Sequence, residues 1–324
     1  MQWTGVKVAV LPCLALGDTT LYLRLAWHFS KAGAQVTLFS TPFVSMQKHI
    51  AGVAIAESAG LELQGLVEQF DLLVIDTAWL YLGLTPQQEM FSASKIAFTC
   101  AKKLPKALGL EAREVIVNGH SLGHINAPLR KRRSDDHMVA WIDRYAEQAF
   151  GLNVTHGDAL LTGLSAPSSQ QAKRVAIFPT TPMQAKNYSL AGFKFVARTL
   201  QRQGWEVEFV CTPSEQDGLR ADLQKWPLQA FGTIGELARY LGGCAVVISN
   251  DSGGGHLGSL LGLATFTVTR RAQTFAWRPG FNRFNQVISP LFTFKFMGKP
   301  VWRPFIPIWR IAQSLGSPPG KFGA

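Results

Sequence analysis

The stretch that decides the interpretation of this chain is VVISNDSGGGHLGSLLG, residues 246–262. It begins as a continuous apolar run, which is typical of a buried parallel strand, and continues through a glycine-rich turn into an apolar helix of small residues. Glycines let a backbone approach a ligand closely at unusual φ values, and the free N–H groups at the start of a helix favour an anion. The stretch therefore predicts an anion cradle with phosphate as its natural occupant.

Four residues of this turn are candidates for binding such a ligand: Asp251, Ser252, Gly253 and His256. Because a carboxylate repels phosphate, Asp251 is interpreted as a brace that ties down the N–H groups of its own loop or meets a hydroxyl. The alternative is that the whole turn is only a helix cap after a core strand.

Length and composition favour two domains. The chain has 324 residues and 47% hydrophobic content, which exceeds what one core usually holds. Its four cysteines lie far apart, which predicts neither a zinc site nor a disulfide framework and fits a reducing cytosol. The apolar run near the start contains Pro12 and stops at Asp18, so we expect neither export nor a membrane-spanning segment.

The formal net charge of +11 is unevenly distributed, because nine Lys and Arg and no acidic residue follow Asp251. This asymmetry predicts an anionic partner. Phe and Trp residues are interleaved with these charges, a mixture that suits lipid headgroups or nucleic-acid bases. The alternative is an aromatic core with a solvated basic rim.

Strand-helix-strand units recur along the chain. Residues 6–12 and 35–39 read as parallel strands joined by a helix, and residues 174–210 repeat this arrangement. Ligands of parallel sheets bind beyond the carboxyl ends of strands, where the sequence has Asp18, Thr180 and Thr181.

Two charged side chains follow the strands of the second repeat. Lys186 is in the same loop as the threonines and can reach a diphosphate, although a loop lysine is usually just solvated. Glu215 follows the strand at 205–210, where an acidic residue often takes a ribose hydroxyl; the alternative is a surface glutamate.

Residues 119–123 match the Gly-x-Ser-x-Gly nucleophile elbow, which would make Ser121 the nucleophile of an α/β-hydrolase. An elbow needs a long helix behind it, and Pro128 interrupts that helix. A fortuitous match is therefore favoured.

In their order along the chain, these motifs resemble those of glycosyltransferase family 9, the ADP-heptose:lipopolysaccharide heptosyltransferases. The resemblance is carried by Leu16-Gly17-Asp18, by Pro179-Thr180-Thr181 with Lys186 and Tyr188, by Thr212-Pro213-Ser214-Glu215, and by Asn250-Asp251-Ser252-Gly253 with His256-Leu257. The chain departs from the family pattern at Tyr188, where Trp is usual, at Gly254, where proline is usual, and over residues 268–272. These departures leave the sugar and the nucleobase open.

The resemblance implies an α/β protein of GT-B architecture, with two Rossmann-like domains whose parallel sheets face a central cleft. Residues 1–165 would bind the acceptor. Residues 166–324 would bind the nucleotide-sugar and carry a basic, aromatic tail that can pack back on the N-terminal domain. The implied chemistry is an inverting transfer without metal or other cofactor. Asp18 would be the general base, while Lys186 and the helix end at Gly253 would stabilise the leaving diphosphate. The alternative role for Asp18 is the N-cap of a helix starting at Thr19.

We therefore expect a heptosyltransferase-like enzyme that moves a heptose or related sugar from ADP-heptose to a lipopolysaccharide core acceptor. Its expected partners are the nucleotide-sugar, a lipid-linked anionic saccharide and the inner-membrane surface, and no nucleic acid. Its expected location is the cytoplasmic face of the inner membrane of a Gram-negative bacterium. The rival interpretations are an esterase that uses Ser121 and a basic nucleic-acid-binding protein that uses the tail.

Overall fold

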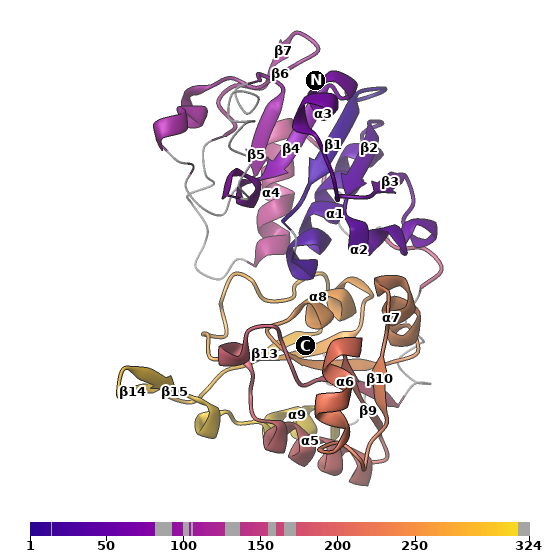
Figure 1. Ribbon diagram of the computed structural model, residues 1–324, viewed down its shortest axis with the longest axis vertical. Helices are drawn as coiled ribbons and strands as arrows, with labels where there is room; N and C mark the ends of the chain where they lie inside the picture. The colour runs from indigo at the N-terminus through magenta and orange to yellow at the C-terminus, as the bar shows by residue number, and fades with distance from the viewer. Residues whose placement is uncertain are drawn as a thin grey trace. The chain divides into compact units, whose positions relative to one another are not determined.

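Two parallel β-sheets organise the chain, one in each of two units, Met1–Thr162 and Gly163–Ala324 (Figure 1). The computed structural model describes residues 1–13, 15–81, 93–99, 104, 106–126, 137–154, 160–164 and 173–316. Each sheet carries helices on its faces, which is the doubly wound α/β arrangement that the alternating strand and helix patterns predict.

The first unit has a five-stranded sheet in the order β3-β2-β1-β4-β5, and all neighbouring strands are parallel. Its strands are β1 (Lys7–Leu11), β2 (Gln35–Phe39), β3 (Val53–Ala56), β4 (Leu72–Asp76) and β5 (Ile96–Thr99). The α-helices described for this unit are α1 (Leu16–Lys31), α2 (Thr41–Val44), α3 (Leu63–Gln69) and α4 (Met138–Phe150). A separate antiparallel pair consists of β6 (Ile116–Val117) and β7 (His120–Ser121).

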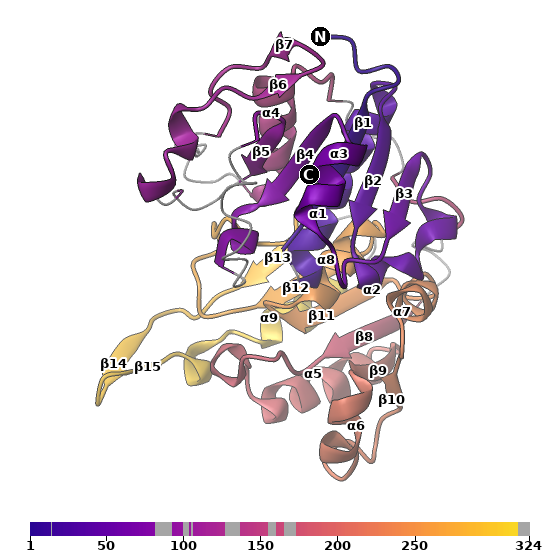
Figure 2. The ribbon, with the colours of Figure 1, turned by 45° about the horizontal axis from the view of Figure 1, so that its top comes forward.

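The second unit has a six-stranded parallel sheet in the order β10-β9-β8-β11-β12-β13. Its strands are β8 (Arg174–Phe178), β9 (Glu206–Cys211), β10 (Leu228–Ala230), β11 (Val246–Asn250), β12 (Ala264–Val268) and β13 (Asn285–Ile288). The α-helices described for it are α5 (Leu190–Arg202), α6 (Pro213–Arg220), α7 (Ile234–Leu241), α8 (Gly253–Leu260) and α9 (Trp309–Gly316). A small antiparallel pair, β14 (Phe294–Phe296) and β15 (Lys299–Val301), projects from this unit in both views (Figure 2).

The central strands are where the apolar runs predicted them. The apolar run of residues 72–76 predicts a strand and forms β4, and the helical pattern of residues 234–241 forms α7, each with the expected bounds. The run that begins at Val246 forms β11, in which every residue is buried. The pattern of residues 59–70 predicts a helix from residue 59, but α3 begins at Leu63, because Gly60 adopts a left-handed φ of 70° in the preceding turn.

The described part of the C-terminal tail packs within the second unit. Its apolar residues join the core beneath the six-stranded sheet, and α9 lies against α5. The tail residues in this core are Trp302, Ile306, Ile308, Ile311, Ala312 and Leu315. Among the described residues, no helix combines the length and the hydrophobicity that a membrane span requires.

Both sheets have a topological switch point, where the order of strands reverses beside the first strand. This point lies between β1 and β4 in the first unit and between β8 and β11 in the second. Loops that leave such neighbouring strands diverge to opposite faces, and ligands bind in the space outside the carboxyl ends. The residues that follow β1, β4, β8 and β11 are therefore the first candidates for a functional site.

Candidate active site

An ion pair joins the two strands at the switch point of the second unit. Lys186 belongs to a short 3₁₀ helix, Gln184–Lys186, in the loop after β8, and Asp251 directly follows β11. The Nζ atom of Lys186 lies 3.3 Å from Oδ2 of Asp251, and Nε of Arg271 lies 3.9 Å from the same oxygen. Two cations therefore share one carboxylate that is only 11% exposed, which leaves a net positive charge at this edge.

Asp251 acts as a brace, but not in the way the sequence indicated. We expected its carboxylate to hold the N–H groups of its own loop or to meet a hydroxyl. Among the described residues its partners are instead the side chains of Lys186 and Arg271. The carboxylate therefore orients these two cations by its ion pairs with them.

The buried side chain of Asn250 closes the loop that carries Lys186. Its Oδ1 accepts a hydrogen bond from the Tyr188 N–H at 2.8 Å, and its Nδ2 donates to the Pro179 carbonyl at 2.8 Å. Both ends of the loop are thus tied to β11. The sequence identified Asn250 only as part of a motif and did not predict this role, because nothing local in the sequence shows which backbone groups a buried amide contacts.

Two further side chains hold the same loop from different sides. Arg303 donates from Nε to the Asn187 carbonyl at 2.6 Å and from its terminal nitrogen to the Gln184 carbonyl at 3.2 Å. Within the loop, Oγ1 of Thr181 lies 2.7 Å from Oδ1 of Asn187 and 3.0 Å from the Met183 carbonyl. Thr181, a predicted donor-binding residue, therefore uses its hydroxyl to shape the loop.

Replacing Asn250 by Ala is expected to lower the free energy of unfolding by about 1–3 kcal/mol, because two buried backbone groups lose their partners. The loop would also hold Lys186 less firmly. Urea unfolding and the affinity for ADP, measured together, check both effects. The exposed Asn153 offers a control, since Asn153→Ala should change neither quantity. Unchanged stability and unchanged ADP affinity in Asn250→Ala would contradict the positioning role.

The glycines of α8 serve packing rather than unusual backbone angles. Gly253 begins the helix, and neither it nor the next two glycines has a positive φ, so the expectation based on special φ values is wrong. Their small size is needed instead because α8 lies directly on β8 and β11. A Cβ atom would collide at Gly254 with the Phe178 ring (2.7 Å), at Gly255 with Ser249 Oγ (2.6 Å), and at Gly258 with Val247 Cγ2 (2.7 Å).

Ser252 and His256 bring buried polar atoms without protein partners to the start of α8. Ser252 is the N-cap residue, yet its Oγ makes no capping bond. His256 hydrogen-bonds the backbone of Trp277, while its Nδ1 has no partner. Burial lowers the pKa of His256 to about 4, so the imidazole is neutral at pH 7. Both groups are able to hydrogen-bond a polar ligand.

Glu215 and Thr180 are brought together after β9 and β8. The Glu215 carboxylate accepts from the Thr212 N–H at 3.0 Å and from the Thr212 hydroxyl at 2.7 Å, which forms the capping box of α6. Burial acts to raise the pKa of Glu215, but the hydrogen bonds from Thr212 and Thr180 outweigh it and lower the pKa. Glu215 therefore remains ionised and engaged in the cap, and a contact with a ribose stays a prediction.

A second group of polar residues lies at the switch point of the first unit. Asp18 is in the first turn of α1, and the Cys13 thiol hydrogen-bonds to its carboxylate. Asp76, at the end of β4, accepts from the Tyr22 hydroxyl at 2.6 Å and from the Ala78 N–H at 2.7 Å. Burial, with help from Asp18 and Asp76, raises the pKa of the Cys13 thiol. The N-terminus of a helix favours a carboxylate, so Asp18 is held at the positive end of α1.

Asp18 is not the N-cap of its helix. The helix begins at Leu16 rather than Thr19, and Ala15 occupies the N-cap position. The alternative that Asp18 caps a helix starting at Thr19 is therefore wrong. Asp76 was missed by sequence reasoning, although its position at the end of a predicted strand was a usable signal.

Residues 86–291 match the model of glycosyltransferase family 9 (heptosyltransferase), which is well over half of the chain. The chain belongs to glycosyltransferase family 9. No curated protein sequence matches it. Solved structures show the same fold at low identity. The E. coli heptosyltransferase WaaC with ADP is 14% identical and has a TM-score of 0.63, with 95% of this chain and 98% of that chain covered.

Two further structures agree with this comparison. E. coli ADP-heptose LPS heptosyltransferase II is 15% identical with a TM-score of 0.60, and 95% of this chain and 97% of that chain are covered. A family 9 glycosyltransferase from Veillonella parvula is 13% identical with a TM-score of 0.57, and 100% of this chain and 93% of that chain are covered. The predicted family, the α/β fold of the GT-B type and the enzyme class are thereby confirmed.

In this family 9 glycosyltransferase, Ser121 is not a nucleophile elbow. It lies on β7 of a short hairpin whose turn residues, Asn118 and Gly119, have φ values of 48° and 80°. That is a hairpin turn and not a strand-to-helix turn. The exposed Ser121 hydroxyl accepts from the Gly123 N–H at 3.0 Å. Pro128, which the sequence argument used, lies outside the described residues. The hairpin geometry around Ser121 is by itself enough to make the esterase interpretation wrong.

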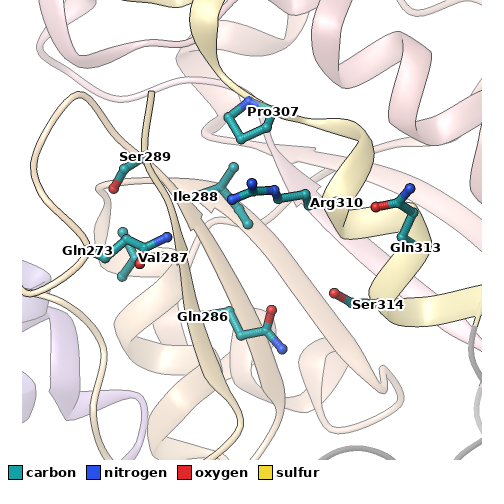
Figure 3. Close-up of a pocket in the computed structure, with 9 residues that line it drawn as sticks. All are labelled: Gln273, Gln286, Val287, Ile288, Ser289, Pro307, Arg310, Gln313 and Ser314. Carbon is teal, nitrogen blue, oxygen red and sulfur yellow. The ribbon is translucent and has the colours of Figure 1, made fainter. Parts of the chain in front are cut away.

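A cavity of about 350 Å³ lies between β13 and α9 (Figure 3). Its polar lining comes from neutral side chains and one cation, Arg310, whose side chain lies between α9 and β13 in Figure 3. Ser289, at its rim, donates a hydrogen bond to the Arg271 carbonyl at 2.7 Å. The described residues of this lining include no carboxylate, histidine or cysteine, and we assign no chemistry to the cavity. The neutral polar lining residues are Gln273, Gln286, Ser289, Gln313 and Ser314.

Proposed function

We propose that this family 9 enzyme is an inverting, metal-independent glycosyltransferase that moves a heptose or related sugar from a nucleoside-diphosphate donor to a lipopolysaccharide core acceptor. The observation that carries the proposal is the cluster of Lys186, Asp251 and Arg271 beside the start of α8 at the β8/β11 switch point. A cationic cluster at a helix N-terminus suits a diphosphate, and family membership supplies the sugar-transfer chemistry.

ADP-heptose is the donor that we propose first. Two structures of the similar heptosyltransferase WaaC contain ADP and an ADP-2-deoxy-2-fluoro heptose. In this chain, the unpartnered atoms of Ser252 and His256 would hydrogen-bond the donor, with Gly253 at the start of α8. Thr180, Thr181 and Glu215 would complete the donor site on the second unit.

The proposed reaction uses the two switch points for different steps. The acceptor, held by the first unit, loses its hydroxyl proton to the Asp18 carboxylate as its oxygen attacks the anomeric carbon. The bond from that carbon to the diphosphate breaks at the same time, with inversion. The electron pair stays on the leaving phosphate oxygen, where Lys186 and the N–H groups of α8 stabilise it.

We also propose that the acceptor is lipid-linked and anionic, and that the enzyme works at the cytoplasmic face of the inner membrane of a Gram-negative bacterium. The net charge of +11 and the absence of acidic residues after Asp251 in the sequence support an anionic partner.

A panel of nucleotides and nucleotide-sugars tests the donor. ADP-heptose and ADP should raise the melting temperature more than UDP- or GDP-sugars, since a ligand at 100 times its Kd adds about 2.7 kcal/mol of stability. Incubation with ADP-heptose and a lipopolysaccharide core acceptor should then give a product of inverted anomeric configuration by NMR. The absence of any shift with ADP and every nucleotide-sugar would overturn the proposal.

Transfer is expected to continue in excess EDTA, with less than about a twofold change in rate, because Lys186 and the helix N–H groups meet the charge of the leaving group without a metal. Among the described residues, no three His, Cys, Asp or Glu side chains gather closely enough to hold a metal ion. Initial rates with EDTA, and with EDTA followed by excess magnesium, check this. Loss of activity that magnesium or manganese restores would contradict it.

A further inference from the structure

The hairpin of β14 and β15 exposes a concentration of apolar side chains that its own unit does not cover. Residues 291–301, here named the aromatic hairpin, project from the second unit (Figure 1). In the described part of the chain, half of the ten large exposed hydrophobic residues fall within seven positions of this segment. They are Leu291, Phe292, Phe294, Phe296 and Met297, with exposures between 47% and 86%.

The backbone pairing explains why these side chains stay exposed. Phe294 pairs with Val301 and Phe296 pairs with Lys299, so these four side chains share one face. Met297 and Gly298, at φ values of 47° and 75°, form the tight turn at the tip. A two-stranded sheet has no second layer, and an isolated hairpin of this kind is only marginally stable in water. Its apolar face therefore calls for an external partner.

The base of the aromatic hairpin is firmly attached. The Leu291 N–H donates to the Phe305 carbonyl at 2.9 Å, and the Phe292 and Phe305 rings are 3.8 Å apart between centroids. Arg303, two residues after β15, donates to carbonyls of the loop that carries Lys186. The segment that follows the aromatic hairpin is thus hydrogen-bonded to the loop of the proposed donor site.

The charges of the hairpin select an anionic partner. Lys295 stands between Phe294 and Phe296, and Lys299 follows the turn. Arg303 comes after β15, and the whole sequence after Asp251 contains no Asp or Glu. Aromatic rings and lysines together are typical of segments at the interface of a bilayer. There the rings lie at the level of the headgroups, and each lysine reaches the phosphates with its ammonium.

Other occupants fit the hairpin less well. Pairing with a strand of a second copy is hindered by Pro300 on β15 and by the lysine on each strand, since both residue types blunt an edge. Single-stranded nucleic acid would use the rings for stacking, but it gives no role to Leu291 and Met297, whose aliphatic side chains suit acyl chains.

We propose that the aromatic hairpin docks into the interfacial region of an anionic phospholipid bilayer. This extends the proposed function, on which its biological purpose rests, because it names the part of the chain that meets the membrane of a lipid-linked acceptor. The docking itself requires no sugar donor. A test of membrane docking is therefore independent of a test of the sugar-transfer reaction.

Sedimentation with vesicles tests the proposal, using phosphatidylcholine alone and phosphatidylcholine with 30 mol% phosphatidylglycerol at about 0.1 M salt. The wild-type protein should bind the anionic vesicles. The double variant Lys295→Gln/Lys299→Gln should bind them about 30-fold more weakly, and Phe294→Ser/Phe296→Ser at least about tenfold more weakly.

Matched controls come from the same unit. Phe195 on α5 is 49% exposed, so Phe195→Ser removes an equally exposed ring elsewhere, and Lys173→Gln/Lys225→Gln removes two exposed lysines elsewhere. These controls should bind vesicles within about twofold of wild type. All hairpin variants should keep the wild-type melting temperature and its shift with ADP, which separates docking from the donor site.

Three results would overturn the proposal. The first is equal vesicle binding by wild type and both hairpin variants, or no binding by any of them. The second is binding to single-stranded DNA that exceeds binding to anionic vesicles and depends on the hairpin. The third is a dimer, seen by analytical ultracentrifugation, that both hairpin variants abolish. If vesicle binding depends on the hairpin but no transfer occurs with any donor, the docking stands and the proposed function fails.

Discussion

Turnover of the Asp18→Asn variant is expected to fall about 100- to 10,000-fold, or about 2.7–5.4 kcal/mol in the barrier. The amide has nearly the shape of the carboxylate but cannot take the proton of the acceptor hydroxyl. Asp18 is in the first turn of α1 and is not its N-cap, so the folded state loses a favourable charge at a helix N-terminus, which contributes about 0.3–1 kcal/mol. Steady-state kinetics, ADP affinity and the melting temperature should be measured on the same preparation.

Asp76 provides the matched control for this prediction. It is a carboxylate at the end of the neighbouring strand, and its oxygens already accept from Tyr22 and Ala78. If Asp18 is the base, Asp76→Asn should affect turnover far less than Asp18→Asn. An equal loss in both variants would indicate a general effect of negative charge at this edge. Turnover of Asp18→Asn close to wild type would remove Asp18 from the chemistry.

The Lys186→Ala variant is expected to lose about 2–4 kcal/mol of transition-state stabilisation, which is about a 30- to 1,000-fold fall in turnover. The ammonium meets the charge that develops on the leaving diphosphate. Its removal also leaves Asp251 with Arg271 alone, so the cluster loses its excess positive charge. Lys186→Arg should recover part of the activity, because the charge remains while the shape of the donor group changes.

A second lysine-aspartate pair in the same unit serves as the control. Lys194 contacts Asp222 at 2.9 Å on the exposed surface, and Lys194→Ala should cost at most about 1 kcal/mol of stability and leave turnover unchanged. Wild-type turnover in Lys186→Ala would exclude this lysine from the site. A loss of ADP affinity without any fall in turnover at saturating donor would assign Lys186 to binding alone.

Much of the fold could be predicted because parallel sheets are buried on both faces. Their strands therefore read as short continuous apolar runs, and residues 35–39 and 72–76 were located with the correct ends. Helix starts were less accurate. The beginning of α1 at Leu16 and that of α3 at Leu63 depend on turn geometry, which apolar periodicity does not contain.

The candidate site could be predicted in part for the same reason. In a parallel sheet, residues that follow the strands come to one edge, so the order of motifs was enough to bring Lys186 and Asp251 to the same switch point. Their direct ion pair, the bridging role of Asn250 and the capping role of Glu215 were not predictable. Each depends on side-chain packing between segments far apart in the sequence.

The sequence by itself determined the class of this protein: its buried strands, the order of its loops and the residue types that follow the strands define a family 9 glycosyltransferase. The tertiary structure alone decided which contacts those residues make. The glycines of α8 show the difference, because their need for small size comes from Phe178, Ser249 and Val247 on the strands beneath them. The aromatic hairpin shows it again. Composition cannot separate a phenylalanine in a core from one on a two-stranded ribbon, since only the number of layers that pack around a side chain determines its exposure.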